Sequence, residues 1–366
     1  MEIKLAVALR LLRGASYLDM IWYGVQLSTV HLIFGFMLEL LDSVLTDSEV
    51  YNFDPQNSNF LEECRHIASD WSSIMVRKRG HDIMKGTILA GDGLVVAIKA
   101  PTEDDRQGLP VAKFYNRKGC FAVCVQAFVD AWCRFRYFEV QWPGSTNDCT
   151  SYKQTALYRW WMGGLLADCF HMVLDEAYGS IGTSNHLTPF SRHQLRRART
   201  DDFPRYLKMR AFNNMLSSQR ITVERAFGIY VRKWGILWKP LEYPLHVNIQ
   251  IISVCSKLHN ITISSWMKKG HLAETTSSIE SCYVQQRDVG LFMGWGDEDT
   301  YNTYVEHYDD RLVQELYGNH LDYPRAAPSN SRREELLTNI YDCGIRFDAR
   351  ADRDFMYREE GERDFL

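Results

Sequence analysis

The stretch at 219–241 has the apolar spacing of a helix that packs on one face. Its apolar residues recur at i, i+4, i+7 and i+11, which follows the period of an α-helix: Val223, Phe227, Tyr230 and Trp234. Glu224 lies one position away from this stripe, at the edge where such a helix meets a sheet. This carboxylate has an ordinary explanation, because Arg220 stands one turn earlier and such pairs are common on helices.

Upstream of this helix, the pattern changes to that of strands. Residues 87–98 form a first strand, broken at its glycines, and 120–128 with 133–142 form a hairpin. A helix at 148–161 and a short apolar strand at 171–174 follow. This order predicts an α/β fold in which helices flank a mixed sheet.

The first 45 residues read as short helices joined by glycine turns. Helices are expected at 6–13, 17–22 and 29–41, with Ser28 capping the last and Ser28 and Thr29 at its exposed start. This is the pattern of a helix-turn-helix unit, in which these two residues would contact DNA. A helical hairpin that only packs remains the alternative, because the last helix carries little positive charge.

The chain divides into four regions on this pattern. Residues 1–50 form the helix-turn-helix-like unit, and 51–85 a linker followed by a helix. Residues 86–265 form the α/β domain, with a basic insertion at 179–218. Residues 266–366 form an acidic tail with a helix near 332–344.

The net charge of −4 hides a basic middle and an acidic tail. The segment 191–240 contains many cations, among them Arg196, Arg197, Arg225 and Arg232. Only three acids oppose them: Asp201, Asp202 and Glu224. This distribution indicates a polyanionic partner for the middle of the chain.

Cysteine usage and hydropathy indicate a soluble intracellular protein. The nine cysteines include no CxxC pair, so neither a disulfide framework nor a zinc knuckle is expected. Cys255 and His259 are spaced as a metal-ligand pair, but core packing explains them better because no further ligands accompany them. No signal peptide is expected, nor an uninterrupted apolar run of the roughly 18 residues that a membrane span needs.

Three acids are placed where the predicted elements would bring them together. Asp92 lies in the first strand, Asp175 at the end of the fourth, and Glu224 on the helix that packs on the sheet. If the first and fourth strands are neighbours, the three carboxylates meet and need cations to neutralise them. Two Mg²⁺ ions about 3.5–4 Å apart would do so and would cleave phosphodiesters. Taken singly, the first two acids read as an ordinary turn and an ordinary strand-end cap.

Short motifs along 86–263 resemble those of PIF/Harbinger-type transposases and the nucleases domesticated from them. They occur in the family's order: Gly91-Asp92-Gly93, 115–119 with 125–127, 143–148, 175–178, 187–190, 224–228 with Arg232 and Trp234, and 257–260. The 48 residues between Asp175 and Glu224 also agree with the family's pattern.

The resemblance implies an RNase H-like catalytic domain with a DDE triad. Asp92, Asp175 and Glu224 would be the catalytic residues and the ligands of two divalent ions, Mg²⁺ or Mn²⁺. Asp148 would be an additional acid that orients a metal-bound water or caps its helix. The chain departs from the family around the triad, where Leu94 and Val95 follow Gly93 and Leu174 precedes Asp175.

The resemblance also implies a function and partners. The protein would cleave DNA at transposon ends and join them to a target. The alternatives are a domesticated, catalytically weak DNA-binding protein and a phosphodiesterase acting on RNA·DNA hybrids. Expected DNA contacts are Ser28, Thr29, Arg117, Lys118, Arg196, Arg197, Arg225 and Arg232. A Myb/SANT-like partner is expected to dock on the tail and assist entry to the nucleus from a cytoplasmic pool, while a homodimer is left open.

Overall fold

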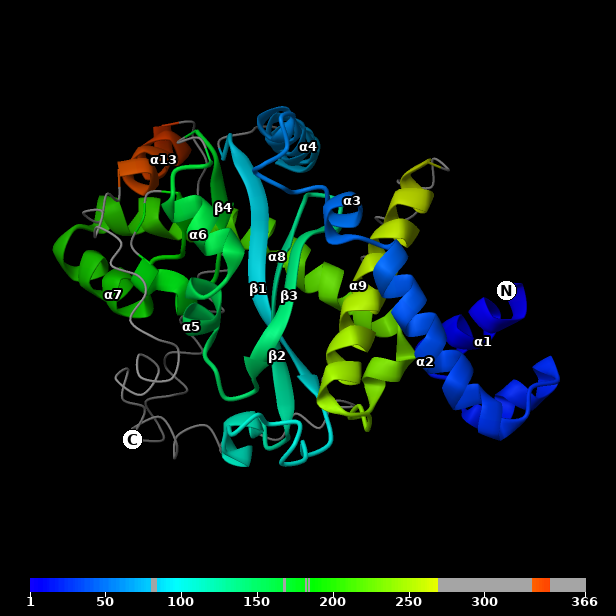
Figure 1. Ribbon diagram of the computed structural model, residues 1–366. Helices are drawn as coiled ribbons and strands as arrows, with labels where there is room; N and C mark the ends of the chain where they lie inside the picture. Colours follow the sequence, from blue (N-terminus) through cyan, green and yellow to red (C-terminus); the bar gives the residue numbers. More distant parts are fainter. Residues whose placement is uncertain (80–83, 167–168, 182, 184, 269–330, 343–366) are drawn as a thin grey trace. The chain divides into compact units, whose positions relative to one another are not determined.

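The computed structural model describes residues 1–79, 84–166, 169–181, 183, 185–268 and 331–342 (Figure 1). The chain is α/β, with a five-stranded sheet in the order β3-β2-β1-β4-β5. β2 and β3 are antiparallel, whereas β4 is parallel to both β1 and β5. The sheet is therefore mixed and flanked by helices, as predicted. The first and fourth strands are neighbours, which meets the condition on which the placing of the acids depended.

The chain folds as two compact units, each assembled from separate segments. The first unit consists of Met1–Leu61, Gly91–Leu166 and Thr222–Arg325, and the second of Glu62–Ala90, Ala167–Ile221 and Ala326–Leu366. Three elements contribute residues to both units: α4 (Phe60–Arg79), β1 (Thr87–Ala97) and α8 (Phe203–Lys233). Each unit is described by itself below.

The first unit is organised around a hairpin and a long helix. Its elements are α1 (Glu2–Leu12), η1 (Tyr17–Tyr23), α2 (Leu27–Val44), α3 (Asp47–Tyr51), η2 (Val111–Phe114), β2 (Ala122–Val129), β3 (Phe135–Pro143), α5 (Asp148–Lys153), α6 (Ala156–Met162), η4 (Gly235–Trp238) and α9 (Leu245–Lys268). α9 packs on β3 and on α2, and α1 packs on α2 (Figure 1). Every residue of β2 is buried, so this hairpin lies in the core.

The C-terminal part of α9 is hydrogen-bonded to the start of β3. The amide of Asn260 accepts from Phe135 N at 2.8 Å and donates to Phe135 O at 2.7 Å. Nε2 of His259 lies 2.8 Å from Cys133 O. The Asn260 side chain thus makes the two backbone hydrogen bonds to Phe135 that a neighbouring strand would otherwise make. These bonds fix α9 against the hairpin.

Cys255 and His259 are buried in this core, as predicted. Both are fully buried, and burial lowers the pKa of His259 to about 4, so its imidazole is neutral. The ring of His259 packs against Phe135 at 4.8 Å between centroids.

The N-terminal helices differ from the prediction in two respects. η1 is a 3-10 helix, capped by Ser16, which accepts from Leu18 N. α2 begins at Leu27, so Ser28 is an exposed residue of its first turn and not its cap. The helix-turn-helix function of this region stays a prediction.

α2 is an apolar helix of a kind that the sequence analysis did not expect. Of the residues that the structure describes, Leu27–Val44 is the one helix long and apolar enough to cross a membrane, with a mean hydropathy of 1.5. One face of α2 is buried inside the first unit: Val30, Ile33, Phe34, Met37 and Leu38.

The second unit pairs the start of β1 with β4. Its other elements are α4 (Phe60–Arg79), β4 (His171–Val173), η3 (Glu176–Ile181), β5 (His186–Leu187), α7 (Arg192–Asp201) and α13 (Ser331–Asp342). In the parallel register, Thr87 is opposite His171 and Ala90 is opposite Val173. The indole of Trp71 on α4 donates to Ile88 O at 3.2 Å, which holds this helix on the strand.

Three predicted elements have different bounds in the structure. The helix expected at 148–161 is two helices, because Thr155 accepts from Tyr158 N at 3.0 Å and so caps a new helix. The helix expected at 219–241 begins at Phe203 and ends at Lys233. The first strand is continuous through its glycines.

Within the second unit, the basic insertion is ordered structure that the sequence reading missed. It contains β5, α7 and the first half of α8. The apolar stripe predicted at 219–241 belongs to the first unit, and its burial is confirmed: Val223, Phe227 and Tyr230 on α8 are buried, as is Trp234 directly after the helix.

Asp130, in the turn between β2 and β3, is the anchor of the hairpin. Its carboxylate is fully buried and pairs with Arg134 at 2.7 Å and Arg136 at 2.9 Å. It also accepts from Trp132 N and Arg134 N. Burial raises the pKa of this carboxyl, but the charges of Arg136 and Arg134 outweigh burial and bring the pKa below its ordinary value.

Replacing Asp130 with Asn retains the size of the side chain but leaves two arginines without an anion. We expect the free energy of unfolding, measured by urea denaturation at pH 7, to fall by about 3–5 kcal/mol. The wild type should lose this stabilisation as pH falls from above 3.8 through the lower pKa of the folded state, and the variant should not. Glu103→Gln, at an exposed loop carboxylate, is the control and should change neither quantity. Equal stability of Asp130→Asn and wild type would show that the ion pairs contribute nothing.

Candidate active site

Asp92 is carried by β1 beyond the stretch that pairs with β4. The residue is half-buried, and its Oδ1 accepts from Gly93 N at 2.8 Å. The five residues of β1 before Asp92 are buried, whereas the four from Asp92 onward are half-buried. The carboxylate therefore lies where the strand leaves the core.

Asp148 approaches this part of β1 from α5. A Cβ atom built on Gly93 would lie 2.0 Å from Oδ1 of Asp148, so only glycine leaves room for the carboxylate. Asn147 caps α5 by accepting from Thr150 N at 2.7 Å. The side chain of Gln126 on β2 donates to Ser151 at 2.7 Å, which ties α5 to the sheet.

Lys118 brings positive charge to the same two carboxylates, and Arg117 directly precedes it. They lie in a turn whose backbone is held by Asn116, which accepts from Lys118 N at 2.8 Å and from Cys120 N at 3.3 Å. Burial lowers the pKa of Lys118, and the nearby charge of Arg117 lowers it further. Asp148 and Asp92 act in the opposite direction, so both carboxylates lie within electrostatic reach of Lys118.

Glu224 lies on the part of α8 that belongs to the first unit. It is half-buried beside Val223, which is fully buried. Arg225 is half-buried next to it, and Arg232 is exposed in the last turn of the helix. The predicted position of Glu224 at the edge of the apolar stripe is therefore confirmed.

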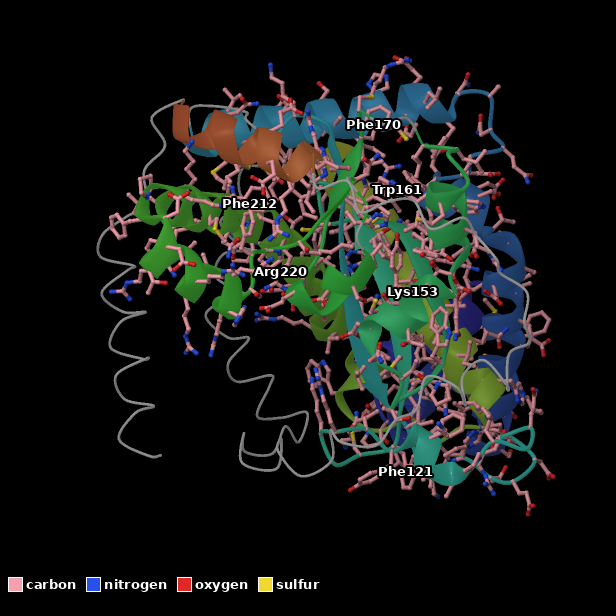
Figure 2. All side chains as sticks on the ribbon, turned by 90° about the vertical axis from the view of Figure 1, so that its left-hand side faces the viewer. Phe121, Lys153, Trp161, Phe170, Phe212 and Arg220 are labelled. Atoms are coloured by element: carbon pink, nitrogen blue, oxygen red, sulfur yellow. The ribbon has the colours of Figure 1, made fainter. Side chains whose placement is uncertain are left out.

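Asp175, in the second unit, comes two residues after the last residue of β4. Nη1 of Arg220, labelled in Figure 2, lies 3.7 Å from Oδ2 of Asp175, and Glu176 N donates to Oδ1 at 2.8 Å. The side chain of Asp175 remains 43% exposed. The sequence reading considered Arg220 only as a partner of Glu224, one turn further along α8.

The four acids described above all lie within one segment that matches a known protein family. Residues 91–260 match a family model described as DDE superfamily endonuclease. The match begins one residue before Asp92 and includes Asp148, Asp175 and Glu224. No curated protein and no solved structure matches the chain.

The DDE match does not by itself identify a metal site. Among the residues that the structure describes, no three His, Cys, Asp or Glu side chains are grouped so as to hold a metal ion. The assignment of Asp92, Asp175 and Glu224 as metal ligands therefore stays a prediction.

The remaining expected DNA contacts lie on two helices. Arg196 and Arg197 are exposed on α7, where Arg197 pairs with Asp201 at 3.4 Å. Ser28 and Thr29 are exposed on the first turn of α2. The structure thus leaves all four accessible within their own units.

The sequence reading missed two contacts at these acids. The first is between Gly93 and Asp148, which are 55 positions apart and have no spacing signal that links them. The second is between Arg220 and Asp175. The Asp92-Gly93 pair was the available signal for the first contact, because a glycine inside a strand often marks a close approach.

Gly93→Ala should displace the carboxylate of Asp148, because the added Cβ occupies the position of Oδ1. We expect a loss of about 1–3 kcal/mol in the free energy of unfolding, as for an overpacked core. Asp148→Ser in the same chain removes the clashing atoms, so the two changes should be coupled in a double-mutant cycle. Gly35→Ala on α2, where nothing lies within 4 Å, is the control and should be neutral or stabilise by up to about 1 kcal/mol. Strict additivity of the two changes at the site would contradict the contact.

Proposed function

We propose that the protein is a divalent-metal-dependent DNA endonuclease of the transposase type, with Asp92, Asp175 and Glu224 as its catalytic residues. The register of two parallel strands is the observation that carries this proposal. Ala90 on β1 is opposite Val173 on β4, and Asp92 and Asp175 each follow two residues later. Asp92 is still on β1 and Asp175 follows the end of β4, so each acid stands two residues along the chain from the last pair that joins these strands.

The three side chains suit a hard divalent cation. All supply carboxylate oxygens, which Mg²⁺ and Mn²⁺ prefer over nitrogen or sulfur ligands. Asp175 already lies beside the cationic Arg220, so the second unit provides an anionic position that accepts positive charge. When bound, two such ions would activate an attacking oxygen and stabilise the leaving one.

The chain's own residues would position the DNA. Lys118, within electrostatic reach of Asp92 and Asp148, and its neighbour Arg117 would bind the phosphate that flanks the scissile bond. Asp148 would orient the water network around Asp92, since its carboxylate lies against the following residue. The exposed α7 cations and Arg232 would contact phosphates without regard to sequence.

Further parts of the proposal come from the resemblance to Harbinger-type transposases. Cleavage would occur at transposon ends and be followed by strand transfer to a target. The residues after 268, which lie largely outside the described structure, would dock a Myb/SANT-like partner that assists entry to the nucleus. Ser28 and Thr29 would add contacts to DNA.

Purified protein should cleave DNA only when Mg²⁺ or Mn²⁺ is present. Asp92→Asn, Asp175→Asn and Glu224→Gln should each lower the single-turnover rate by about a thousandfold, because each removes a ligand charge at nearly constant shape. The assay is nicking of a labelled plasmid or oligonucleotide, with circular dichroism to check folding.

The control is Glu176→Gln, an exposed carboxylate directly after Asp175, which should cleave at the wild-type rate. Undiminished cleavage in EDTA, or full activity of any of the three triad variants, would refute the metal-dependent mechanism.

Reversing two charges on α7 should weaken binding to every DNA sequence alike. For Arg196→Glu with Arg197→Glu, we expect the slope of log affinity against log salt to become shallower by about two, as two phosphate contacts are lost. Fluorescence anisotropy on two unrelated duplexes measures this. Arg10→Glu with Lys99→Glu makes the same charge change at exposed sites elsewhere and should have a smaller effect. A change in sequence preference would instead mean that α7 reads bases.

A further inference from the structure

The C-terminal helix α13 is packed into the second unit by apolar and polar contacts. Leu336 and Leu337 are almost fully buried, at 1% and 2% exposure. Arg332 donates to Lys85 O at 3.0 Å, and Glu334 pairs with Arg205 at 2.7 Å. This helix therefore belongs to the same body as the basic insertion, although 62 residues outside the described structure separate it from α9.

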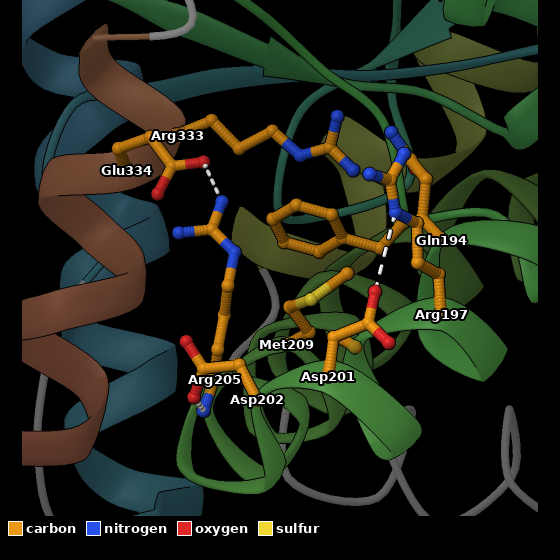
Figure 3. A pocket seen from close by; sticks show the side chains of 10 residues that line it. Gln194, Arg197, Asp201, Asp202, Arg205, Met209, Arg333 and Glu334 are labelled. Carbon is orange, nitrogen blue, oxygen red and sulfur yellow. Dashed lines mark hydrogen bonds and ion pairs between the residues drawn. The ribbon is translucent and has the colours of Figure 1, made fainter.

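A cavity of about 290 Å³ lies between α13, α7 and the turn into α8 (Figure 3). Phe190 and Met209 contribute apolar surface to its lining. Three cations also line it: Arg197, Arg205 and Arg333. Figure 3 shows Arg333 reaching from α13 across the cavity towards Gln194 and Arg197.

Arg333 lines this cavity and has hydrogen-bond donors that no group satisfies. Its Nε and Nη2 atoms are buried and have no hydrogen-bond partner. These two atoms share one edge of the planar guanidinium, and that edge binds both oxygens of a carboxylate or phosphate. The guanidinium carbon lies 3.5 Å from the centroid of the Phe190 ring, which fixes the plane of the group.

The Phe190 ring that packs against this guanidinium is itself held in place. Asn213 accepts from Phe190 N at 2.8 Å and donates to Phe190 O at 2.9 Å. The ring of Phe190 packs edge-on against Phe212, at 5.4 Å between centroids. The aromatic surface beneath Arg333 is therefore part of the rigid core of the second unit.

Each acid that lines the cavity is engaged elsewhere. Glu334 pairs with Arg205, Asp201 with Arg197, and Asp202 accepts from Arg205 N at 3.0 Å. Burial lowers the pKa of Arg333 to about 10, a shift that a bound anion would oppose. Arg333 therefore lines the cavity with hydrogen-bond donors that none of these acids satisfies.

We propose that this cavity binds a phosphate group through the Nε and Nη2 edge of Arg333. Phosphate is favoured over an isolated carboxylate because the outer face of α7 adds exposed cations that attract a polyanion: Arg192, Arg196 and Arg199. The source that this surface fits is a backbone phosphate of DNA, and that part rests on the proposed function. Free inorganic phosphate shares the chemistry, and the experiment separates the two.

The test uses full-length protein in EDTA, so that neither metal nor cleavage enters. Inorganic phosphate binding is followed by ³¹P NMR titration, and binding of a DNA duplex by fluorescence anisotropy. Arg333→Gln should weaken both by about tenfold or more, because it removes charge-assisted hydrogen bonds. Arg10→Gln removes one exposed charge from α1, outside the second unit, and should change either affinity by less than about twofold.

Arg333→Lys keeps the positive charge but removes the pair of fixed donors of the guanidinium. It also provides the test if Arg333→Gln does not fold. It should bind both ligands several-fold more weakly than wild type, because lysine cannot donate from two fixed positions. Wild-type affinity of Arg333→Lys, or equal losses in Arg333→Gln and Arg10→Gln, would overturn the site. Loss of phosphate binding with unchanged DNA affinity would overturn DNA as the source. Failure of metal-dependent cleavage would refute the proposed function without changing any of these outcomes.

Discussion

The hydroxyl of Thr87 is the point at which β1, β4 and α8 are fixed to one another in the second unit. It lies 2.8 Å from Nε2 of His171 on β4 and 3.1 Å from Oε1 of Gln219 on α8, and it also donates to Met84 O. Burial lowers the pKa of His171 to about 3, so the imidazole is neutral and hydrogen-bonds without the cost of a buried charge. The pairing shifts by one residue between Thr87 and Leu89, and beyond this irregularity Ala90 faces Val173. The proposed role of Asp92 and Asp175 depends on this second register.

Much of this arrangement follows from the sequence because it depends on local periodicity. The hairpin of β2 and β3 consists of two runs of strand-forming residues joined by a turn at Asp130, and the stripe from Val223 to Trp234 has a helical period. The pairing of the first and fourth strands was considered only as a condition for bringing the acids together. Such patterns are set by which face each side chain must bury.

Contacts between segments distant in sequence left no comparable signal. The space that Gly93 leaves for Asp148, and the stacking of Arg333 on Phe190, depend on the fold having formed. Short elements were also missed: β5 has two residues, and one hydroxyl cap at Thr155 divides the predicted helix. In each case a single tertiary contact or cap outweighs the helical or strand pattern of its neighbours.

The charged side chains of this protein differ in how many of their hydrogen-bonding positions are occupied. This difference helps to distinguish side chains that support the fold from those that could bind a ligand. Asp130 is fully buried, with two arginines and two backbone N–H groups around it, so its oxygens have no capacity left for a ligand. Asp175 has a cation at 3.7 Å and a side chain that is 43% exposed, so its oxygens retain capacity for a further partner. Arg333 has two buried donors that no group satisfies. Because unsatisfied donors at a buried charge cost stability, their retention at Arg333 favours the proposed phosphate site, whereas the fully used oxygens of Asp130 point to the fold.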